Sequence, residues 1–508
     1  MRPRWPLLLA VLALLQAPWL SRAVDFDEAN FLVLARGAAA DPWRPHDVLI
    51  NWQGRTERAF DVLSNPPGIA WWLAPLHNAP IELQRAWMLP WLALALFGAR
   101  RLGRRFLDDA DFGALVLLTS PIVLLSTVSL LPDAPLYACT LAGVGGFVGA
   151  IDRGGRGAVA WAFLAGCAGL FRYSGVCLAP LLALYALQRG RPPWAAFAAW
   201  APLGLLALHD EAAYGAWHLV AMGQFQSVSN TPADWLHKGA AILTMLGGAA
   251  ALPLFPWTWT TLAGGAVGAA LASPFGLIAA GFGALGGASL ATGLGPALAS
   301  GRRSYIGPAV GPVPTDLRAD RRWLAVWILG GVVFLLTLRF MAARYWLPFL
   351  APVLLSLPVR RFPRLYLALS LSLGVLLEAD AFTQARAVER LANEVAHLGQ
   401  GLYTGHWGWQ WEMEAHGWRA VDEGTRVPPD TLIAMPHQAW PQPVDVACVT
   451  VVWEGAARPP LPWLPRGYSE RGRANLHANW IADQPPHRTV IPWTFANDAY
   501  ERVRVCRD

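Results

Sequence analysis

Apolar segments dominate the first three quarters of this 508-residue chain and limit what it can fold into. Hydrophobic residues make up 55% of the chain and charged residues only 15%, against about 25% charged in globular proteins. We therefore predict an all-α polytopic membrane bundle of about 13 transmembrane helices, although a full span needs about 20 residues. The predicted segments are 5–20, 80–99, 111–131, 134–151, 157–171, 174–188, 193–208, 238–254, 257–277, 278–299, 322–338, 345–359 and 364–378.

Arginine clusters predict how this bundle is oriented. They fall on one side of it, at residues 2–4, 100–105, 153–156, 189–191, 302–322 and 360–364. The positive-inside rule makes that side cytoplasmic. The N-terminus is then cytoplasmic in the inner membrane of a bacterium, and loop 21–79 and the tail lie outside. Region 238–300 has no basic marker within its apolar segments, so one more or one fewer pair of spans fits there.

The tail differs in composition from the bundle. Residues 379–508 are polar and rich in Trp, Pro and His, with a predicted helix at 384–398 and strand-like runs at 432–437 and 446–453. We predict two domains: a catalytic transmembrane bundle over 1–378, which includes loop 21–79, and a small extracytoplasmic mixed α/β domain over 379–508. Outside the cytoplasm, Cys448 and Cys506 suit a disulfide. The tail aromatics either stack on sugars or form its core.

Three carboxylates follow the first apolar segment, in the run Val24-Asp25-Phe26-Asp27-Glu28. Ser21-Arg22-Ala23 just before them also fits a signal-peptide cleavage site. The acidic run favours the alternative, an uncleaved first helix with its basic end inside. Carboxylates beside a bilayer are expensive to hold unless they have a function, and they are good general bases. This run is therefore the first candidate for catalysis.

Charged residues from later in the chain lie on the same predicted side. Asp133 stands at the start of predicted helix 134–151, where capping alone would explain it, yet it shares a face with Asp27. Arg172 lies between two sub-length segments, and Arg339 and Arg344 flank the turn before segment 345–359. Snorkelling to lipid headgroups explains such arginines. Recognition of a phosphate or an anionic headgroup explains them equally well.

Taken together, these residues resemble the integral-membrane GT-C glycosyltransferases. Among these enzymes, the chain most resembles the bacterial relatives of protein O-mannosyltransferases and lipid A aminoarabinose transferases. Short motifs carry the resemblance, and it spans most of the chain. They are Asp27-Glu28-Ala29-Asn30-Phe31, Asn65-Pro66-Pro67-Gly68, Pro132-Asp133-Ala134-Pro135-Leu136 and Arg344-Tyr345-Trp346-Leu347-Pro348, with Gly405-His406-Trp407-Gly408-Trp409-Gln410 in the tail.

The resemblance implies an inverting transferase that works outside the cytoplasm. A hexose or pentose would pass from a polyprenyl-phosphate carrier to a glycan, lipid or protein acceptor. Carried over residue by residue, it implies Asp27 as the general base, with Glu28 or Asp133 positioning the acceptor or the donor. It implies that Arg172, Arg344 and Tyr345 hold the carrier phosphate. All these groups must then share one pocket at the outer leaflet.

The chain departs from the aminoarabinose transferases at two positions. Ser64-Asn65 stand where Glu-Lys precedes the Pro-Pro pair, and Asn30 stands where those enzymes have Arg. These changes remove contacts to metal or phosphate, and they argue against aminoarabinose transfer to lipid A. No cofactor is certain. A divalent metal stays open, since His209, Asp210 and Glu211 supply donor atoms without a ligand spacing.

Two other classes of protein remain as alternatives. A transporter or flippase for an anionic glycolipid also needs outward arginines, although transporters often have repeated halves and this chain has no clear repeat. A non-catalytic assembly or sensor protein with a glycan-binding tail is the third candidate. Membrane lipids are expected partners in every case, and nucleic acid in none.

Overall fold

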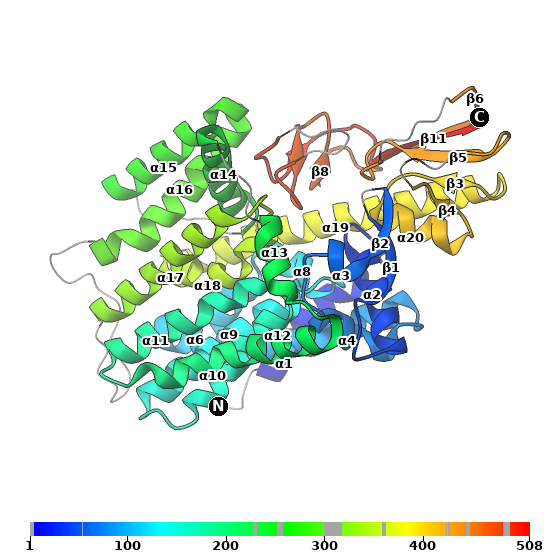
Figure 1. The fold of residues 1–508 in the computed structure, drawn as a ribbon. Coiled ribbons are helices and arrows are strands. Elements are labelled where there is room, and N and C mark those ends of the chain that lie inside the picture. The colour runs from blue at the N-terminus through cyan, green and yellow to red at the C-terminus, as the bar shows by residue number, and fades with distance from the viewer. Residues whose placement is uncertain are drawn as a thin grey trace.

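The structure is a computed structural model that describes residues 5–52, 54–226, 231–250, 258–298, 317–357, 362–422, 424, 427–442, 448–480 and 488–507. The described chain is mostly helical, and its strands gather largely near the C-terminus (Figure 1). The 34-residue helix α19 (Pro363–Ala396) runs from the helical bundle to the C-terminal sheet. The prediction of a helical bundle with a small C-terminal sheet region is confirmed at this level.

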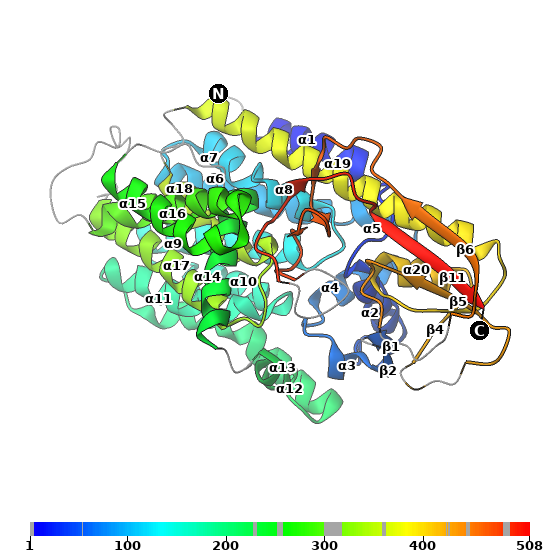
Figure 2. The ribbon, with the colours of Figure 1, turned by 90° about the horizontal axis from the view of Figure 1, so that it is seen from above.

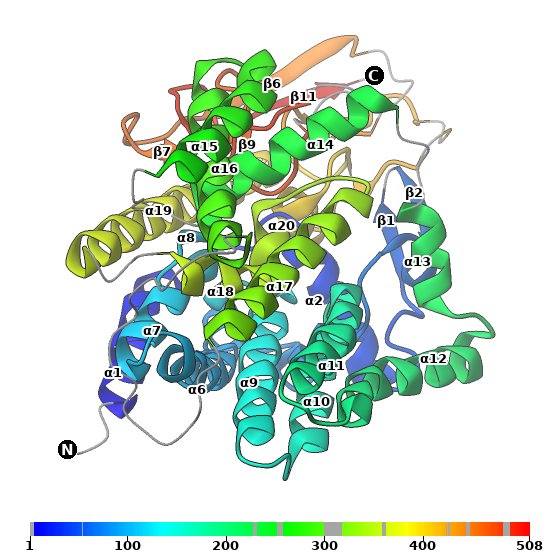
Figure 3. The same cartoon turned by 90° about the vertical axis from the view of Figure 1, so that its left-hand side faces the viewer.

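The remaining helices surround α9 (Asp133–Asp152) or cover one end of the bundle. Figure 3 shows α14–α16 stacked on the side of α17 and α18 away from α9. Their bounds are α1 (Trp5–Gln16), α2 (Glu28–Ala40), α3 (Ala59–Val62), α4 (Gly68–Leu73), α5 (Ile81–Ala86), α6 (Leu89–Phe106), α7 (Ala110–Leu118), α8 (Pro121–Thr127), α10 (Ala158–Gly166), α11 (Leu178–Gln188), α12 (Ala201–Tyr214), α13 (His218–Gln226), α14 (Pro232–Met245), α15 (Trp259–Ala272), α16 (Leu277–Leu298), α17 (Leu317–Thr337), α18 (Leu347–Ser356) and α20 (Trp407–Ala415).

The predicted count of about 13 spans is not confirmed. Three helices in the described part are long and apolar enough to cross a membrane: α9, Leu277–Gly295 of α16, and α19. The pair α7 and α8 adds a fourth if it counts as one span, although it bends by 79°. Pro121 begins α8 and cannot continue the helix before it. Apolar windows in the sequence therefore joined short helices that the backbone separates.

Helix α19 also corrects the predicted helix 384–398, because it runs unbroken through residue 378, the predicted domain boundary. Polar residues usually end a membrane span, but Asp380 in the middle of α19 has hydrogen-bond partners in the protein. Asp380 accepts hydrogen bonds from the Gly467 amide at 2.7 Å and the Tyr500 hydroxyl at 2.8 Å. Its other partner is the buried guanidinium of Arg466, at 3.3 Å. The C-terminal domain thus docks on the polar half of a continuous helix.

The C-terminal sheet has five strands in the order β4-β3-β5-β11-β6. Strand β3 runs parallel to β4 and β5, whereas β11 is antiparallel to β5 and β6. Helix α20 packs on α19 beside this sheet, so the C-terminal region contains both helix and sheet. The strands are β1 (Leu49–Trp52), β2 (Arg55–Arg58), β3 (Leu402–Tyr403), β4 (Arg419–Ala420), β5 (Leu432–Pro436), β6 (Thr450–Ala457), β7 (Pro465–Arg466), β8 (Tyr468–Ser469), β9 (Ala474–Asn475), β10 (Thr494–Phe495) and β11 (Glu501–Arg507).

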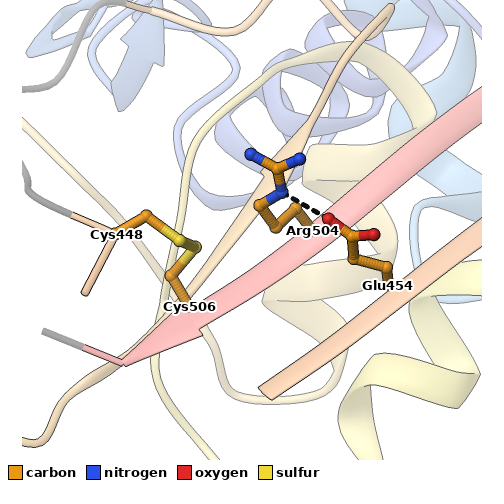
Figure 4. Close-up of a disulfide and its surroundings, with 4 residues drawn as sticks. All are labelled: Cys448, Glu454, Arg504 and Cys506. Atoms are coloured by element: carbon orange, nitrogen blue, oxygen red, sulfur yellow. Dashed lines mark hydrogen bonds and ion pairs between the residues drawn. A yellow bond between two sulfur atoms is a disulfide. The ribbon is translucent and has the colours of Figure 1, made fainter. Parts of the chain in front are cut away.

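A disulfide closes the outer edge of this sheet. Cys448 and Cys506 are bonded, with their Cα atoms 5.2 Å apart, which confirms the predicted pairing. Figure 4 shows the bond near the ion pair between Arg504 on β11 and Glu454 on β6, 2.6 Å long. The predicted strand at 446–453 begins instead at Thr450, and residues 446 and 447 lie outside the described residues.

Loop 21–79 and the five-stranded C-terminal sheet lie together at one end of the molecule (Figures 1 and 2). Helix α20 approaches the acidic run so closely that a β-carbon on Gly408 would lie 2.1 Å from the Val24 carbonyl oxygen. The guanidinium of Arg36 on α2 lies 4.2 Å above the ring of Trp411 on α20. The tail therefore fixes the segment that carries the carboxylates, although about 380 residues separate them.

Candidate active site

Asp27 lies directly before α2, and its side chain faces away from that helix. The carboxylate makes no capping bond to α2. Instead, its Oδ2 accepts a hydrogen bond from Nη2 of Arg344 at 2.8 Å. The side chain remains 29% exposed, so a ligand can reach it. The positive end of the α2 dipole stabilises a negative charge here.

Glu28 points the other way, into the protein. Its carboxylate accepts hydrogen bonds from both terminal nitrogens of Arg85 at 2.8 and 2.7 Å, and from Arg22 at 3.0 Å. Ser129 and the backbone amides of Asp25 and Leu130 complete the set. Burial alone would raise the pKa of Glu28, but the two guanidiniums hold it well below its usual range. This buried cluster anchors the acidic run and leaves Glu28 no free oxygen for substrate.

Asp133 opens α9 and is fully buried. Its two carboxylate oxygens accept a bidentate pair of hydrogen bonds from Nε and Nη2 of Arg172, at 2.8 and 3.1 Å. The Nε of Arg344 lies 3.8 Å from Oδ2 of Asp133. Pro132 is the N-cap residue of α9 and Asp133 is its first residue, so Asp133 is not the predicted helix cap. Arg172 pairs inside the protein, so snorkelling to headgroups does not describe it either.

Arg344 joins the two carboxylates. It lies in the short 3₁₀ helix η8 (Ala343–Trp346), and its side chain is only 7% exposed. Burial would lower the pKa of Arg344, but the charges of Asp27 and Asp133 raise it above its usual value. The ring of Tyr345 faces both guanidiniums, with centroid distances of 5.3 Å to Arg172 and 5.7 Å to Arg344. An aromatic face stabilises cations at this range.

Two further residues belong to the site and were not assigned to it from the sequence. The side-chain oxygen of Asn65 accepts a hydrogen bond from Arg172 at 3.3 Å. His477, from the C-terminal domain, accepts one from Nη1 of Arg344 at 3.3 Å, and its ring stacks on Phe26 at 3.8 Å. Burial and the Arg344 charge lower the pKa of His477 well below its usual value, so its ring is neutral. Asn65 stood in a recognised motif, whereas His477 had no sequence signal.

One cavity of about 210 Å³ collects most of these groups. Asp27, Arg172, Arg344 and Tyr345 line it, together with Asn65 and His477. Glu28 and Asp133 do not. They border a smaller cavity of about 30 Å³, the space of roughly one water, which also touches Asp25 and Arg344. The predicted site residues thus divide into four that line the ligand-sized cavity and two that lie outside its lining.

The residues considered as metal ligands, His209, Asp210 and Glu211, do not form a metal-binding cluster. No cluster of three or more His, Cys, Asp or Glu side chains occurs in the described part of the chain. His209 contacts the carboxylate of its neighbour Asp210 at 3.2 Å and the carbonyl of Trp43 at 2.8 Å. Both ring nitrogens of His209 are therefore in contact with protein groups.

Two solved structures are similar to this chain. One is the crystal structure of ArnT from Cupriavidus metallidurans bound to undecaprenyl phosphate. It is 16% identical, with a TM-score of 0.45 over 86% of this chain and 93% of that chain. The other is the same protein in the apo state, 16% identical, with a TM-score of 0.41 over 85% of this chain and 92% of that chain. ArnT is an aminoarabinose transferase with the GT-C fold.

The two structures belong to one of the families that the sequence motifs resemble. No protein-family model matches the chain, and no curated protein matches it.

Proposed function

We propose that this chain is an inverting glycosyltransferase that moves a sugar from a polyprenyl-phosphate carrier to an acceptor outside the cytoplasm. The observation that carries the proposal is the convergence of Asp27, Arg172 and Arg344, from three distant segments, on one cavity. Undecaprenyl phosphate, the ligand of the ArnT crystal structure, is a carrier of this class. The N-terminus lies in the cytoplasm of a bacterium, and the C-terminal domain lies outside the inner membrane.

Charge balance gives each group its role. Without ligand, two guanidiniums face two carboxylates, so Arg172 and Arg344 are balanced by Asp133 and Asp27. The phosphodiester of a lipid-linked sugar brings one more negative charge, and guanidiniums recognise phosphate through their fork of donors. Arg344 must then share its donors between the phosphate and Asp27. This sharing weakens the ion pair and leaves the Asp27 carboxylate free to accept a proton as the carrier binds.

The transfer step follows from this arrangement. The acceptor hydroxyl attacks C1 of the sugar on the face opposite the phosphate, and its proton passes to Asp27. The bond from C1 to the phosphate oxygen breaks, and its electron pair leaves with the phosphate. A positioned carboxylate base contributes about 10²–10⁴-fold to such a step. Arg172 and Arg344, fixed by buried partners, stabilise the departing phosphate charge without reorganising.

Turnover of a defined donor tests the proposal. Purified full-length protein in lipid nanodiscs is mixed with undecaprenyl-phosphate-linked mannose, glucose, galactose or arabinose, and released undecaprenyl phosphate is measured by mass spectrometry. We expect protein-dependent cleavage of at least one donor, above empty nanodiscs. In proteoliposomes, movement of the donors between leaflets with every donor intact would instead establish the flippase alternative and refute the transferase.

A further inference from the structure

Three large aromatic residues around the cavity have a backbone conformation that such residues rarely adopt. Phe26, Trp407 and Trp440 have φ angles of +36°, +66° and +48°. Positive φ is uncommon for any residue except glycine and is an outlier for bulky ones. Such strain concentrates at functional sites, where the surrounding structure enforces it. All three residues line the cavity that holds Asp27.

Their rings form a continuous surface, which we call the aromatic wall. The Phe26 and Trp407 rings lie 5.1 Å apart, and those of Trp407 and Trp440 lie 6.4 Å apart. Both tryptophans are partly exposed, whereas Trp409 and Trp418 are fully buried in the core of the C-terminal domain. Trp409 and Trp418 therefore belong to the core. Trp407 packs against the edge of that core and, like Trp440, lines the cavity.

The local backbone places Trp407 at the edge of the core, where its ring lines the cavity. Gly405, two residues earlier, also has a positive φ, of +90°. Gly408, one residue later, is pressed against the Val24 carbonyl. With the chain held tightly on both sides, the Trp407 ring turns toward the cavity while Trp409 turns inward and donates its indole N–H to the Thr404 carbonyl.

A polar group completes this end of the cavity. Asn30 lies one turn after Asp27 on α2, lines the same cavity and is only 4% exposed. Its side-chain oxygen has no hydrogen-bond partner among the described residues. A buried carbonyl oxygen without a partner is costly, and a ligand hydroxyl would satisfy it.

We propose that the aromatic wall and Asn30 bind an uncharged sugar ring of the acceptor, so that the acceptor is a carbohydrate. The C–H face of a sugar ring packs on aromatic faces, and its hydroxyls bind amide oxygens. The side chains of the wall and Asn30 carry no charge, which suits a neutral ring. His477 lies between the wall and Arg344, because its ring stacks on Phe26 of the wall and accepts a hydrogen bond from Arg344. The wall therefore begins beyond the phosphate end of the cavity, where the acceptor must approach.

This inference rests on the proposed function and is tested separately from it. Full-length protein in nanodiscs is titrated with methyl mannoside, methyl glucoside, methyl galactoside and a threonine-containing peptide, and binding is followed by saturation-transfer NMR. We expect at least one glycoside to bind with its ring C–H protons saturated. Trp407→Ala and Trp440→Ala should each weaken that binding about tenfold. Undecaprenyl phosphate binding should be unchanged in both variants.

Two tryptophans of the same domain serve as controls. Trp463→Ala removes an indole that is 61% exposed and outside the cavity lining, and it should leave glycoside binding unchanged. Trp409→Ala removes a core ring and should lower the melting temperature far more than Trp407→Ala does. Binding of the peptide but of no glycoside would overturn the inference. Full glycoside binding by both wall variants would also overturn it, while intact undecaprenyl phosphate binding would leave the proposed function standing.

Discussion

Arg344 donates a 2.8 Å hydrogen bond to the carboxylate of Asp27, although 317 residues separate them in the chain. The same guanidinium lies 3.8 Å from Asp133, which Arg172 holds from its other side. The group proposed to bind phosphate is thus the group that restrains the proposed base. In the proposed mechanism, one side chain therefore links carrier binding to Asp27.

Replacing Arg344 should weaken carrier binding. Hydrogen bonds to charged groups contribute about 1.5–3 kcal/mol, so we expect Arg344→Ala to raise the Kd for undecaprenyl phosphate by about 10–100-fold. The Kd of Arg344→Lys should lie between those of wild type and Arg344→Ala, because an ammonium keeps the charge but lacks the planar fork of donors. Equilibrium binding in nanodiscs measures the effect. Arg504→Ala, which breaks an exposed pair on β11, is the matched control, and equal Kd values for all three variants would refute the assignment.

Glu28 should matter for stability before it matters for chemistry. Glu28→Gln keeps the shape but leaves Arg22 and Arg85 buried with less compensating charge. Breaking a buried pair in this way costs about 3–5 kcal/mol, so we expect a large fall in melting temperature. Glu454→Gln, which breaks the exposed ion pair with Arg504, should lower the free energy of unfolding by less than about 1 kcal/mol. An unchanged melting temperature together with lost transfer would instead make Glu28 a substrate-binding group.

The stability of the protein should depend on the titration of Asp25. Burial raises the pKa of Asp25 to about 7, against the opposing charge of Arg22, whereas an unfolded Asp titrates near 3.9. The folded state therefore holds this proton more tightly. Its contribution to stability is complete below about pH 4 and is lost as pH rises through about 7, by at most about 1.4 kcal/mol per pH unit.

Melting temperatures of wild type and Asp25→Asn between pH 5 and pH 8 test this titration. The wild-type value should fall with rising pH, and the variant, which cannot ionise there, should fall less. Parallel curves for the two proteins would show that Asp25 does not titrate in this range.

The disulfide should stabilise the C-terminal domain alone. Cys448→Ser opens a loop across 58 residues, and loss of a native disulfide typically costs about 2–5 kcal/mol. We expect faster proteolysis within residues 448–507 and little change in undecaprenyl phosphate binding. Cys177→Ser, which removes a free cysteine, is the control. Equal proteolysis of the two variants would mean that the bond does not stabilise the domain.

Most of the charged residues of the candidate site could be predicted from the sequence. Asp27, Arg172, Arg344 and Tyr345 were predicted to share a pocket, and all four line one cavity. Charge on the outer side of an apolar bundle is a local signal that composition reveals. Arg85, the main partner of Glu28, gave no such signal, because it lies inside an apolar segment and its partners come from distant loops.

Long-range packing accounts for what the sequence did not reveal. His477 enters the site from the tail, which is held over the bundle by contacts between residues far apart in the sequence. Beside His477, the amide of Ala343 donates a hydrogen bond to the Leu476 carbonyl at 3.1 Å, and the amide of Met341 donates one to the Asn479 side chain at 2.8 Å. The predicted span count is not confirmed for a related reason. Hydropathy windows record apolar composition, whereas the 79° bend between α7 and α8 depends on Pro121 and on packing.

Asp27→Asn tests the central claim most directly, with turnover of a lipid-linked sugar and undecaprenyl phosphate binding measured on the same preparation. The change removes the proton acceptor and releases Arg344 from its ion pair. We predict that turnover falls by about 10²–10⁴-fold, while the Kd for undecaprenyl phosphate stays equal or becomes tighter. Wild-type turnover in a folded Asp27→Asn protein would contradict the assignment of Asp27 as the base.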